Sequence, residues 1–291
     1  MERFLTDKEV AEILPLRDKF GNKGSFGSLL SVCGSEYMTG AAYFVASAAA
    51  RTGVGLVTVA APKSVLKILQ TRLSEPVFFP LSEKDGKICE KSASEIIKLL
   101  ERKSALVIGS GIGTGSGVEK AVKKVIAATE LPKIIDADAL NVLSKTDKPF
   151  KNCKNAVITP HPLEFSRLSG LLVSEITENR EKVAKEYSEK NGVITVLKGA
   201  YTVIAAPDGK TVISPFATSA LAKGGSGDVL AGLIAGFAAT GVKPFDAAVA
   251  GVYIHGLSAT LKAKEIPERC FLPSDLLSAV PDAVKYLEEL K

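Results

Sequence analysis

Residues 223–228, Lys-Gly-Gly-Ser-Gly-Asp, combine a glycine-rich turn with a carboxylate and lead directly into an apolar stretch. The apolar stretch predicts a buried helix, and the first turn of a helix presents free N–H groups and a partial positive charge. Because glycines let the backbone approach an anion closely, this turn could hold phosphate oxygens. The helix dipole should keep Asp228 ionised at neutral pH, beside the bound anion. A base next to an anion-binding turn suits phosphoryl transfer, although an Asp in a first turn can also be a simple helix cap.

Strand-like and helix-like segments alternate along the chain and would position this turn. Uniformly apolar strands are expected at residues 28–32, 55–60, 105–108, 133–136, 156–159 and 193–197. Helices are expected at residues 40–51, 92–102, 118–128 and 178–189. Short apolar strands separated by helices predict an α/β fold, with a mostly parallel central sheet covered by helices on both faces.

The last third of the chain departs from this alternation. Residues 202–205 and 210–213 flank a Pro-Asp-Gly turn, a combination that predicts one β-hairpin. After the hairpin, only helices are expected, at residues 228–240, 244–264 and from about residue 274. No linker, repeat or low-complexity run interrupts the sequence, so we expect a single domain over residues 1–291. Two segments show no recognisable chemistry, residues 62–91 and 267–291.

Five polar loops follow the predicted strands. They span residues 33–41, 109–115, 136–141, 159–164 and 198–202. Ligands bind beyond the carboxyl ends of parallel strands, which meet at one edge of the sheet, so these loops should share one site. The loop at 109–115 misses the G-x-G-x-x-G dinucleotide fingerprint, because Thr114 or Ser116 stands where the third glycine belongs. This argues against a Rossmann-type oxidoreductase.

Single residues in and near these loops allow more than one interpretation. Asp136 and Asp138 are typical of Asx turns and helix caps, which we favour over metal ligation. His161 lies between two prolines after a strand, a position that favours a role in the site over a core histidine. His255 lies within a predicted helix among apolar residues, which favours a packed structural histidine. Lys198 could be a solvated charge at a strand end or could clasp a nucleotide together with the residues that follow it.

Composition limits the classes of partner and compartment. The net charge of +5 is spread along the chain, which is compatible with an anionic small molecule and too weak to indicate nucleic-acid binding. Charged residues interrupt the first nine positions, so no signal peptide is expected, and the apolar run at 41–50 is too short to span a membrane. The four cysteines are far apart and lack metal-ligand spacing. We therefore expect a cytoplasmic protein with reduced thiols and no zinc site.

The motifs, in their order along the chain, resemble those of one protein family. They are Gly34-Ser35 with Gly40-Ala41, Asp136-Ala-Asp-Ala-Leu, Thr159-Pro-His-Pro with Glu164, Lys198-Gly with Thr202, and Gly225-Ser-Gly-Asp. This set is similar to that of the ADP-dependent NAD(P)H-hydrate dehydratases, a branch of the ribokinase-like superfamily. The G-x-G-D element indicates only the superfamily. The T-P-H-P element is more specific, because related vitamin kinases usually have Asn at the position of His161.

The resemblance implies a ribokinase-like three-layer sandwich and a repair reaction. The ring hydroxyl of hydrated NADH or NADPH (the S epimer) would be phosphorylated from ADP, giving AMP, and elimination of phosphate would restore the dihydropyridine. Asp228 would be the catalytic base, while Mg²⁺ and the amides of Gly225, Ser226 and Gly227 would stabilise the transferring phosphoryl group. ATP could replace ADP as donor, because both place phosphates on the same turn.

The same resemblance assigns binding residues. The adenine nucleotide would contact the turn, chiefly Gly227, and the loop residues Lys198, Gly199, Ala200, Tyr201 and Thr202. The hydrated cofactor would contact Ala41, Gly113, His161 and Asp228. Glu164 would organise Mg²⁺ through water. Two departures from the family pattern, Cys33 for glycine and Ser110 for proline, are expected to leave the chemical groups untouched.

The resemblance also carries expectations about partners. The epimerase domain that is often fused ahead of such dehydratases is not in this sequence, so a separate NAD(P)H-hydrate epimerase would interconvert the two epimers. Relatives are often tetrameric, which implies a homotetramer, with no nucleic-acid or membrane partner. Two further alternatives remain: a ribokinase-like small-molecule kinase for a vitamin precursor, which His161 argues against, and a nucleotide sensor in which Asp228 would be dispensable.

Overall fold

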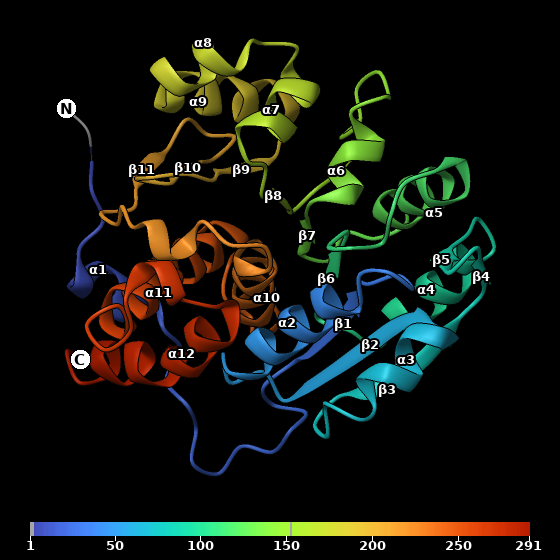
Figure 1. Ribbon diagram of the computed structural model, residues 1–291, viewed down its shortest axis with the longest axis horizontal. Coiled ribbons are helices and arrows are strands. Elements are labelled where there is room, and N and C mark those ends of the chain that lie inside the picture. The colour runs from blue at the N-terminus through green and yellow to red at the C-terminus, as the bar shows by residue number, and fades with distance from the viewer. Residues whose placement is uncertain (1–2, 152) are drawn as a thin grey trace.

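A nine-stranded sheet with the order β11-β10-β9-β8-β7-β6-β1-β2-β3 runs through the molecule (Figure 1). The computed structural model describes residues 3–151 and 153–291, so the first two positions of the N-terminal stretch lie outside the description. The strands are β1 Ser28–Val32, β2 Leu56–Pro62, β3 Val77–Leu81, β6 Ala105–Ile108, β7 Lys133–Ile135, β8 Ala156–Ile158, β9 Ile194–Leu197, β10 Val203–Ala205 and β11 Thr211–Ile213. From β3 through β2, β1, β6, β7 and β8 to β9, neighbouring strands pair in parallel; β10 pairs antiparallel with both β9 and β11. The carboxyl ends of the parallel strands therefore meet at one edge.

Helices cover both faces of the sheet. One face carries α1 Asp7–Ile13, α2 Thr39–Ala50, α3 Lys63–Leu69, α10 Ser226–Ala239, α11 Pro244–Lys262 and α12 Pro273–Glu288. The other carries α4 Ser92–Leu100, α5 Ser116–Ala127, α6 Asp138–Leu143, α7 Pro162–Ser169, α8 Val173–Glu178 and α9 Arg180–Asn191. Successive side chains of a strand point to opposite faces of the sheet. Leu29 therefore packs in the apolar cluster on one face and Leu30 in the cluster on the other. This is why the central strands are apolar throughout.

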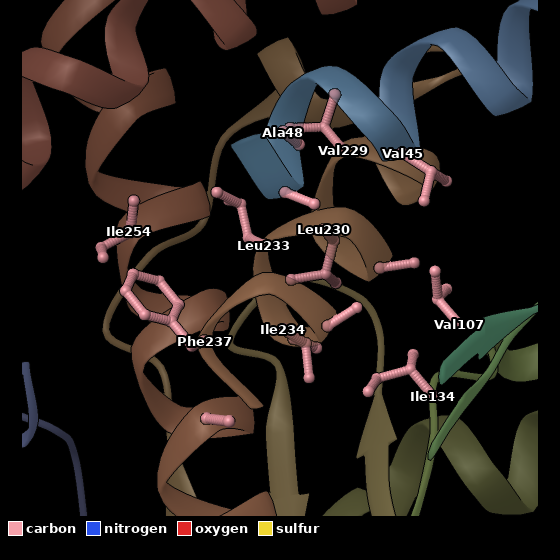
Figure 2. Close-up of a cluster of buried hydrophobic side chains, with 14 of the residues drawn as sticks. Val45, Ala48, Val107, Ile134, Val229, Leu230, Leu233, Ile234, Phe237 and Ile254 are labelled. Atoms are coloured by element: carbon pink, nitrogen blue, oxygen red, sulfur yellow. The ribbon is translucent and has the colours of Figure 1, made fainter. Parts of the chain in front are cut away.

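Helix α10 lies inside the larger core and carries the glycine-rich turn at its start. In Figure 2, its apolar side chains, such as Leu230 and Ile234, lie among Val45 of α2 and Ile134 of β7. A Cβ on Gly232 would lie 2.4 Å from the carbonyl oxygen of Val45, so glycine lets α2 and α10 approach closely. The apolar run after the turn thus fixes the position of the turn against the sheet.

The predicted α/β class and the alternation of elements are confirmed, since each expected strand and helix has a counterpart with nearly the same bounds. The structure adds elements that the sequence pattern did not predict, among them α1, α3, α6 to α8, β3, and a small sheet of β4 Glu83–Lys84 and β5 Lys87–Ile88. Strand β3 lies at the sheet edge, where Val77 is exposed, so it lacks the uniform apolar pattern. Across the part of the chain that the structure describes, no helix has both the length and the apolar character to cross a bilayer.

Candidate active site

A cavity of about 630 Å³ lies at the edge where the parallel strands end. Loops after β7, β8 and β9 line it from the sheet, and the start of α10 and the middle of α11 line it from the helical layer. The cavity brings together most of the predicted site residues, namely His161, Glu164, Lys198, Gly199, Ala200, Thr202, Gly225, Ser226, Gly227 and Asp228. Three of the five predicted polar loops thus share one cavity, whereas the loops at 33–41 and 109–115 do not line it.

The glycine-rich turn is shaped by the entry into α10. Gly225 is the N-cap and adopts a φ of +103°, a left-handed conformation that favours glycine. A Cβ on Gly225 would also lie 3.0 Å from Phe44 of α2 and from Pro273 of α12. A Cβ on Gly227 would lie 3.5 Å from Lys198 Nζ, so the ammonium group faces the turn. An anion bound here would meet both the first-turn amides and a positive charge.

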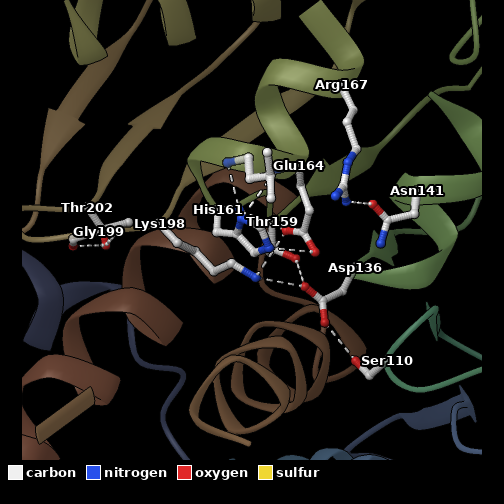
Figure 3. Close-up of polar contacts among 11 residues, drawn as sticks. Ser110, Asp136, Asn141, Thr159, His161, Glu164, Arg167, Lys198, Gly199 and Thr202 are labelled. Atoms are coloured by element: carbon white, nitrogen blue, oxygen red, sulfur yellow. Dashed lines mark hydrogen bonds and ion pairs between the residues drawn. The ribbon is translucent and has the colours of Figure 1, made fainter. Parts of the chain in front are cut away.

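Asp136 is the centre of a buried polar network (Figure 3). Asp136 is 1% exposed, and its carboxylate accepts hydrogen bonds from Ser110 Oγ (2.8 Å), Thr159 Oγ1 (2.6 Å) and Lys198 Nζ (3.2 Å). Lys198 Nζ also lies 3.7 Å from Glu164 Oε2. Burial lowers the pKa of Lys198, but the carboxylates of Asp136 and Glu164 outweigh this effect and raise it overall. The network therefore keeps one positive charge between two carboxylates beside the turn.

The carboxyl group of Asp228 is tuned by its surroundings. Burial raises its pKa to about 7, the charge of Asp136 adds to this, and Lys198 and the Ser110 hydroxyl act in the opposite direction. At neutral pH Asp228 is therefore only about half ionised, rather than fully ionised as predicted, because loss of hydration outweighs the helix dipole. A carboxyl group with a pKa near 7 can take up and release a proton at neutral pH, as a general base must.

His161 and Glu164 cap the start of α7 reciprocally. His161 Nδ1 accepts hydrogen bonds from the N–H groups of Leu163 (3.2 Å) and Glu164 (3.3 Å), and Glu164 Oε2 accepts one from the N–H of His161 (2.8 Å). Because Nδ1 is an acceptor, the ring proton lies on Nε2. Burial lowers the pKa of His161, although Glu164 opposes this, so the ring is neutral at pH 7. A neutral, half-exposed imidazole at the cavity can donate one hydrogen bond to a polar ligand.

The carboxylates of the cavity fit Mg²⁺ through water. This ion prefers oxygen ligands and is usually held by one or two carboxylates, several waters and the phosphates of the substrate. Glu164 is buried and lines the cavity; its Oε2 accepts the N–H of His161, and its Oε1 lies 3.5 Å from His161 Nε2. Within residues 3–151 and 153–291, no group of three His, Cys, Asp or Glu side chains is arranged to hold a metal ion. The role of Glu164 toward Mg²⁺ stays a prediction.

The loop after β9 divides between the cavity and the outer surface. Gly199, Ala200 and Thr202 line the cavity, and Thr202 Oγ1 donates a hydrogen bond to the carbonyl oxygen of Gly199 (2.9 Å). Tyr201 has a positive φ of 54°, is 49% exposed and packs edge-on against Phe4. The backbone conformation turns Tyr201 out of the cavity, so the structure does not bring it together with the other predicted nucleotide contacts.

Ala41, in the first turn of α2, and Gly113, in the loop after β6, do not line the cavity. A Cβ on Gly111 would lie 2.7 Å from Cβ of Ala41, so the loop after β6 packs against the start of α2. The N–H of Gly113 donates a hydrogen bond to Asp138 Oδ2 (2.8 Å), which ties that loop to the start of α6. Both residues lie at the carboxyl edge of the sheet, and the loop of Gly113 also carries Ser110, which contacts the network around Asp136 and Asp228.

Asp136 and Asp138 do not have the capping roles predicted for them. Helix α6 has Ala137 as its N-cap, without a side-chain cap hydrogen bond. The Asp136 carboxylate is instead used in the buried network, and the Asp138 carboxylate binds the N–H of Gly113. Their position directly after an apolar strand does indicate the site. Asx turns and helix caps are the more common roles for Asp at such a position, and for that reason the sequence pattern alone favours them.

Ser110 and His255 contribute in ways that the sequence did not indicate. The expectation that Ser110 leaves the chemical groups untouched is wrong, because its hydroxyl binds Asp136 and lowers the pKa of Asp228. His255 is packed within α11 as predicted, but it also lines the cavity, and its Nε2 lies 2.9 Å from the carbonyl oxygen of Ser226. A contact to a turn 29 residues earlier leaves no trace in the local sequence pattern around a histidine.

The sheet order, the helices on both faces and the glycine-rich turn at the start of α10 define a protein of the ribokinase-like class. Within it, the chain belongs to the NAD(P)H-hydrate dehydratase family, whose sequence profile matches residues 29–282. The family predicted from the motifs is thus confirmed.

Individual relatives agree with this family. The ADP-dependent (S)-NAD(P)H-hydrate dehydratase of Bacillus subtilis is 35% identical over 285 residues, which cover 98% of this chain and 99% of the relative. A crystal structure of ADP/ATP-dependent NAD(P)H-hydrate dehydratase from Bacillus subtilis, co-crystallised with ATP and Mg²⁺, matches with a TM-score of 0.88 and 34% identity over 99% of both chains. The bifunctional NAD(P)H-hydrate repair enzyme of Moorella thermoacetica is 37% identical over 99% of this chain and 54% of its own length. The chain thus spans about half the length of such bifunctional relatives.

Proposed function

We propose that the chain dehydrates the S epimer of hydrated NADH and NADPH back to NADH and NADPH, with an adenine nucleotide as phosphoryl donor and Mg²⁺ as the metal. The observation that carries this proposal is the position of Asp228, whose pKa is about 7, in one cavity with the glycine-rich turn and the buried Lys198–Asp136 pair. The family profile and the similar dehydratases support the substrate and the donor. The enzyme would be a hydro-lyase that repairs damaged cofactor.

In this reaction Asp228 accepts the proton of the ring hydroxyl while the hydroxyl oxygen attacks the terminal phosphorus of the nucleotide. With ADP as donor, the bond from that phosphorus to the bridging oxygen breaks and AMP leaves. The phosphorylated hydrate then loses phosphate together with a proton from the neighbouring ring carbon, which restores the dihydropyridine. The amides of the turn and the Lys198 ammonium group stabilise the charge on the transferring group. Mg²⁺, when bound, supplies further neutralisation of phosphate charge.

The binding roles follow the arrangement of the loops. Lys198, Gly199, Ala200 and Thr202 lie beside the turn, which supports a nucleotide held between the β9 loop and α10. His161 faces the same cavity and offers its Nε2–H to the hydrated cofactor. The start of α2 at Ala41 and the loop of Gly113 would receive the rest of that ligand. Tyr201 would contact the nucleotide only through its backbone, because its side chain turns outward.

The alternative of a vitamin-precursor kinase is not favoured. The matched profile is that of the NAD(P)H-hydrate dehydratases, and a relative of this chain that is 35% identical is such a dehydratase. His161 also stands where the related vitamin kinases usually have Asn. A cytoplasmic location, a homotetramer and a functional link to a separate epimerase stay predictions.

Recovery of dihydronicotinamide absorbance tests the proposal. Purified protein is mixed with hydrated NADPH, Mg²⁺ and either ADP or ATP, and we expect absorbance to return only when a nucleotide is present. The Asp228→Asn variant should bind ADP and recover no absorbance, whereas Asp208→Asn, a matched change in the exposed β10–β11 turn, should behave like the parent. Tight nucleotide binding without recovery with either donor would contradict the proposal and point to the kinase alternative.

A further inference from the structure

We propose that His255 is a positioning residue for the anion-binding turn: its Nε2–H holds the Ser226–Gly227 peptide so that the amide of Gly227 is presented to the transferring phosphoryl group. This inference rests on the proposed function, because it takes the turn at the start of α10 as the phosphoryl site. His255 lies on α11, whereas the turn that it would position is at the start of α10.

The first step is the protonation of the ring. His255 is 9% exposed, and burial lowers its pKa to about 4, with the charge of Lys198 acting in the same direction and its hydrogen bond to Ser226 opposing. The imidazole is therefore neutral at pH 7 and carries one N–H. The group 2.9 Å from Nε2 is a carbonyl oxygen, which can only accept, so the proton lies on Nε2 and points at Ser226.

The second step is the geometry of the peptide that receives this hydrogen bond. The described chain has no cis peptide bonds, so the carbonyl of Ser226 and the N–H of Gly227 lie in one plane and point in opposite directions. Fixing the carbonyl toward His255 therefore fixes the direction of the Gly227 N–H. Gly227 occupies the first turn of α10, where amide groups have no helical partner four residues earlier, and it lines the cavity.

The third step is electronic. A hydrogen bond accepted by the carbonyl of a peptide polarises the unit and strengthens the bond that its N–H can donate. Gly227 has no side chain to steady its backbone, so an external hydrogen bond matters more here than in the middle of the helix. His255 thus supports the turn through the carbonyl of Ser226, while Lys198 Nζ faces Gly227.

Two substitutions of His255 separate positioning from packing. His255→Leu removes the donor, and we expect kcat for hydrated NADPH to fall about tenfold and the Kd of ADP to rise several-fold. His255→Gln places an amide N–H near the position of Nε2 and should recover most of both losses. Ile254→Ala is the control, because Ile254 is a fully buried apolar neighbour on α11 that carries no polar group. It should lower the melting temperature but leave kcat and the Kd of ADP close to those of the parent.

The outcomes decide the inference independently of the reaction assignment. If His255→Leu binds ADP like the parent, or if Ile254→Ala weakens ADP binding as much as His255→Leu does, the positioning role is overturned. Failure of His255→Gln to restore binding while the variant remains folded would overturn it as well. Absence of NADPH recovery by the parent protein would instead contradict the proposed function, and a loss of ADP affinity in His255→Leu that Gln restores would still support the positioning role.

Discussion

Asp228 shows how strongly a single site residue depends on its neighbours. Its pKa of about 7 results from burial and from Asp136, and it is held at that value by the opposing effects of Lys198 and Ser110. Only the ionised carboxylate can accept a proton, so activity should decline as the pH falls through about 7. This decline is the acid limb of the pH–activity profile. The pH at which it occurs therefore reports on the contacts around the Asp228 carboxyl group.

Ser110→Ala should move the acid limb to higher pH. The hydroxyl lowers the pKa of Asp228, so its removal leaves that carboxylate less stabilised as an anion; the hydrogen bond to Asp136 is lost as well. We expect a displacement of roughly half a pH unit, with the plateau value of kcat retained. Rates of NADPH recovery between pH 5.5 and 9 would measure it. Ser258→Ala serves as control, because the Ser258 hydroxyl is buried on α11 and has no hydrogen-bond partner among the described residues. An equal displacement of the pH–rate profile in both variants would contradict the role of Ser110 in setting the pKa of Asp228.

His161→Ala should weaken binding of the hydrated cofactor by roughly fivefold or more, with a smaller loss for ADP, because one hydrogen-bond donor at the cavity is removed. The same change removes the N-cap of α7 and should cost about 1 kcal/mol of stability. His161→Asn keeps a good cap but lacks the ring N–H, so it should stay stable and still bind the hydrated cofactor weakly. Titration calorimetry with both ligands would test this. Equal losses for both ligands in the two variants would indicate a general defect.

At the scale of elements, the sequence predicted best where the local pattern is uniform. Strands β1 and β6 have the bounds that their apolar runs indicate, because Gly or Ser residues flank them and both faces are buried. Strand β3 and helix α7 were not predicted: the first is a half-exposed edge strand, and the second begins with an unusual histidine cap. The loops that share the site follow from strand ends, but the contact of Lys198 with Asp136, 62 residues away, exists only after folding.

The close contact between α2 and α10 gives a stability prediction at this scale. Gly232→Ala should lower the free energy of unfolding by about 1–3 kcal/mol, because the new Cβ would lie 2.4 Å from the backbone of α2 and the two helices would have to separate. Gly40→Ala is a matched change within α2, with no heavy atom within 4 Å of the new Cβ, and should be neutral or slightly stabilising. Urea denaturation of both variants would measure the difference, and equal effects would show that the contact is not limiting.

At the scale of the whole molecule, the buried charges that the reaction needs at the site lower the stability of the fold. The carboxylates of Asp136, Glu164 and Asp228 and the ammonium group of Lys198 are gathered at the end of the sheet, and burial of these charges is costly unless they are paired. Asp136 and Glu164 have Lys198 as partner, whereas Asp228 has a raised pKa and lacks an ion pair within the described residues. The fold therefore tolerates one destabilising carboxylate, which is the group that the reaction requires.

Asp228→Asn should consequently stabilise the protein in a pH-dependent way. In the folded state the pKa of Asp228 is about 7, and in the unfolded chain a carboxyl group titrates near about 3.9. Below about pH 4 the side chain is protonated in both states. As the pH rises from 4 to 7 the unfolded state loses its proton first, so stability falls and then levels off above pH 7. The Asn variant lacks this titration, and its advantage should grow over that window.

Each pKa unit between the two states corresponds to about 1.4 kcal/mol, so the advantage of Asp228→Asn should reach a few kcal/mol above pH 7. Chemical denaturation without nucleotide at pH 4.5, 6 and 8 would measure it, with the exposed Asp208→Asn change as control. Because the neutral Asn cannot accept a proton, the same variant should be inactive although it is more stable. A variant that is less stable than the parent at pH 8, or equally displaced at all three pH values, would show that Asp228 is not strained by burial and that its activation as a base has another origin.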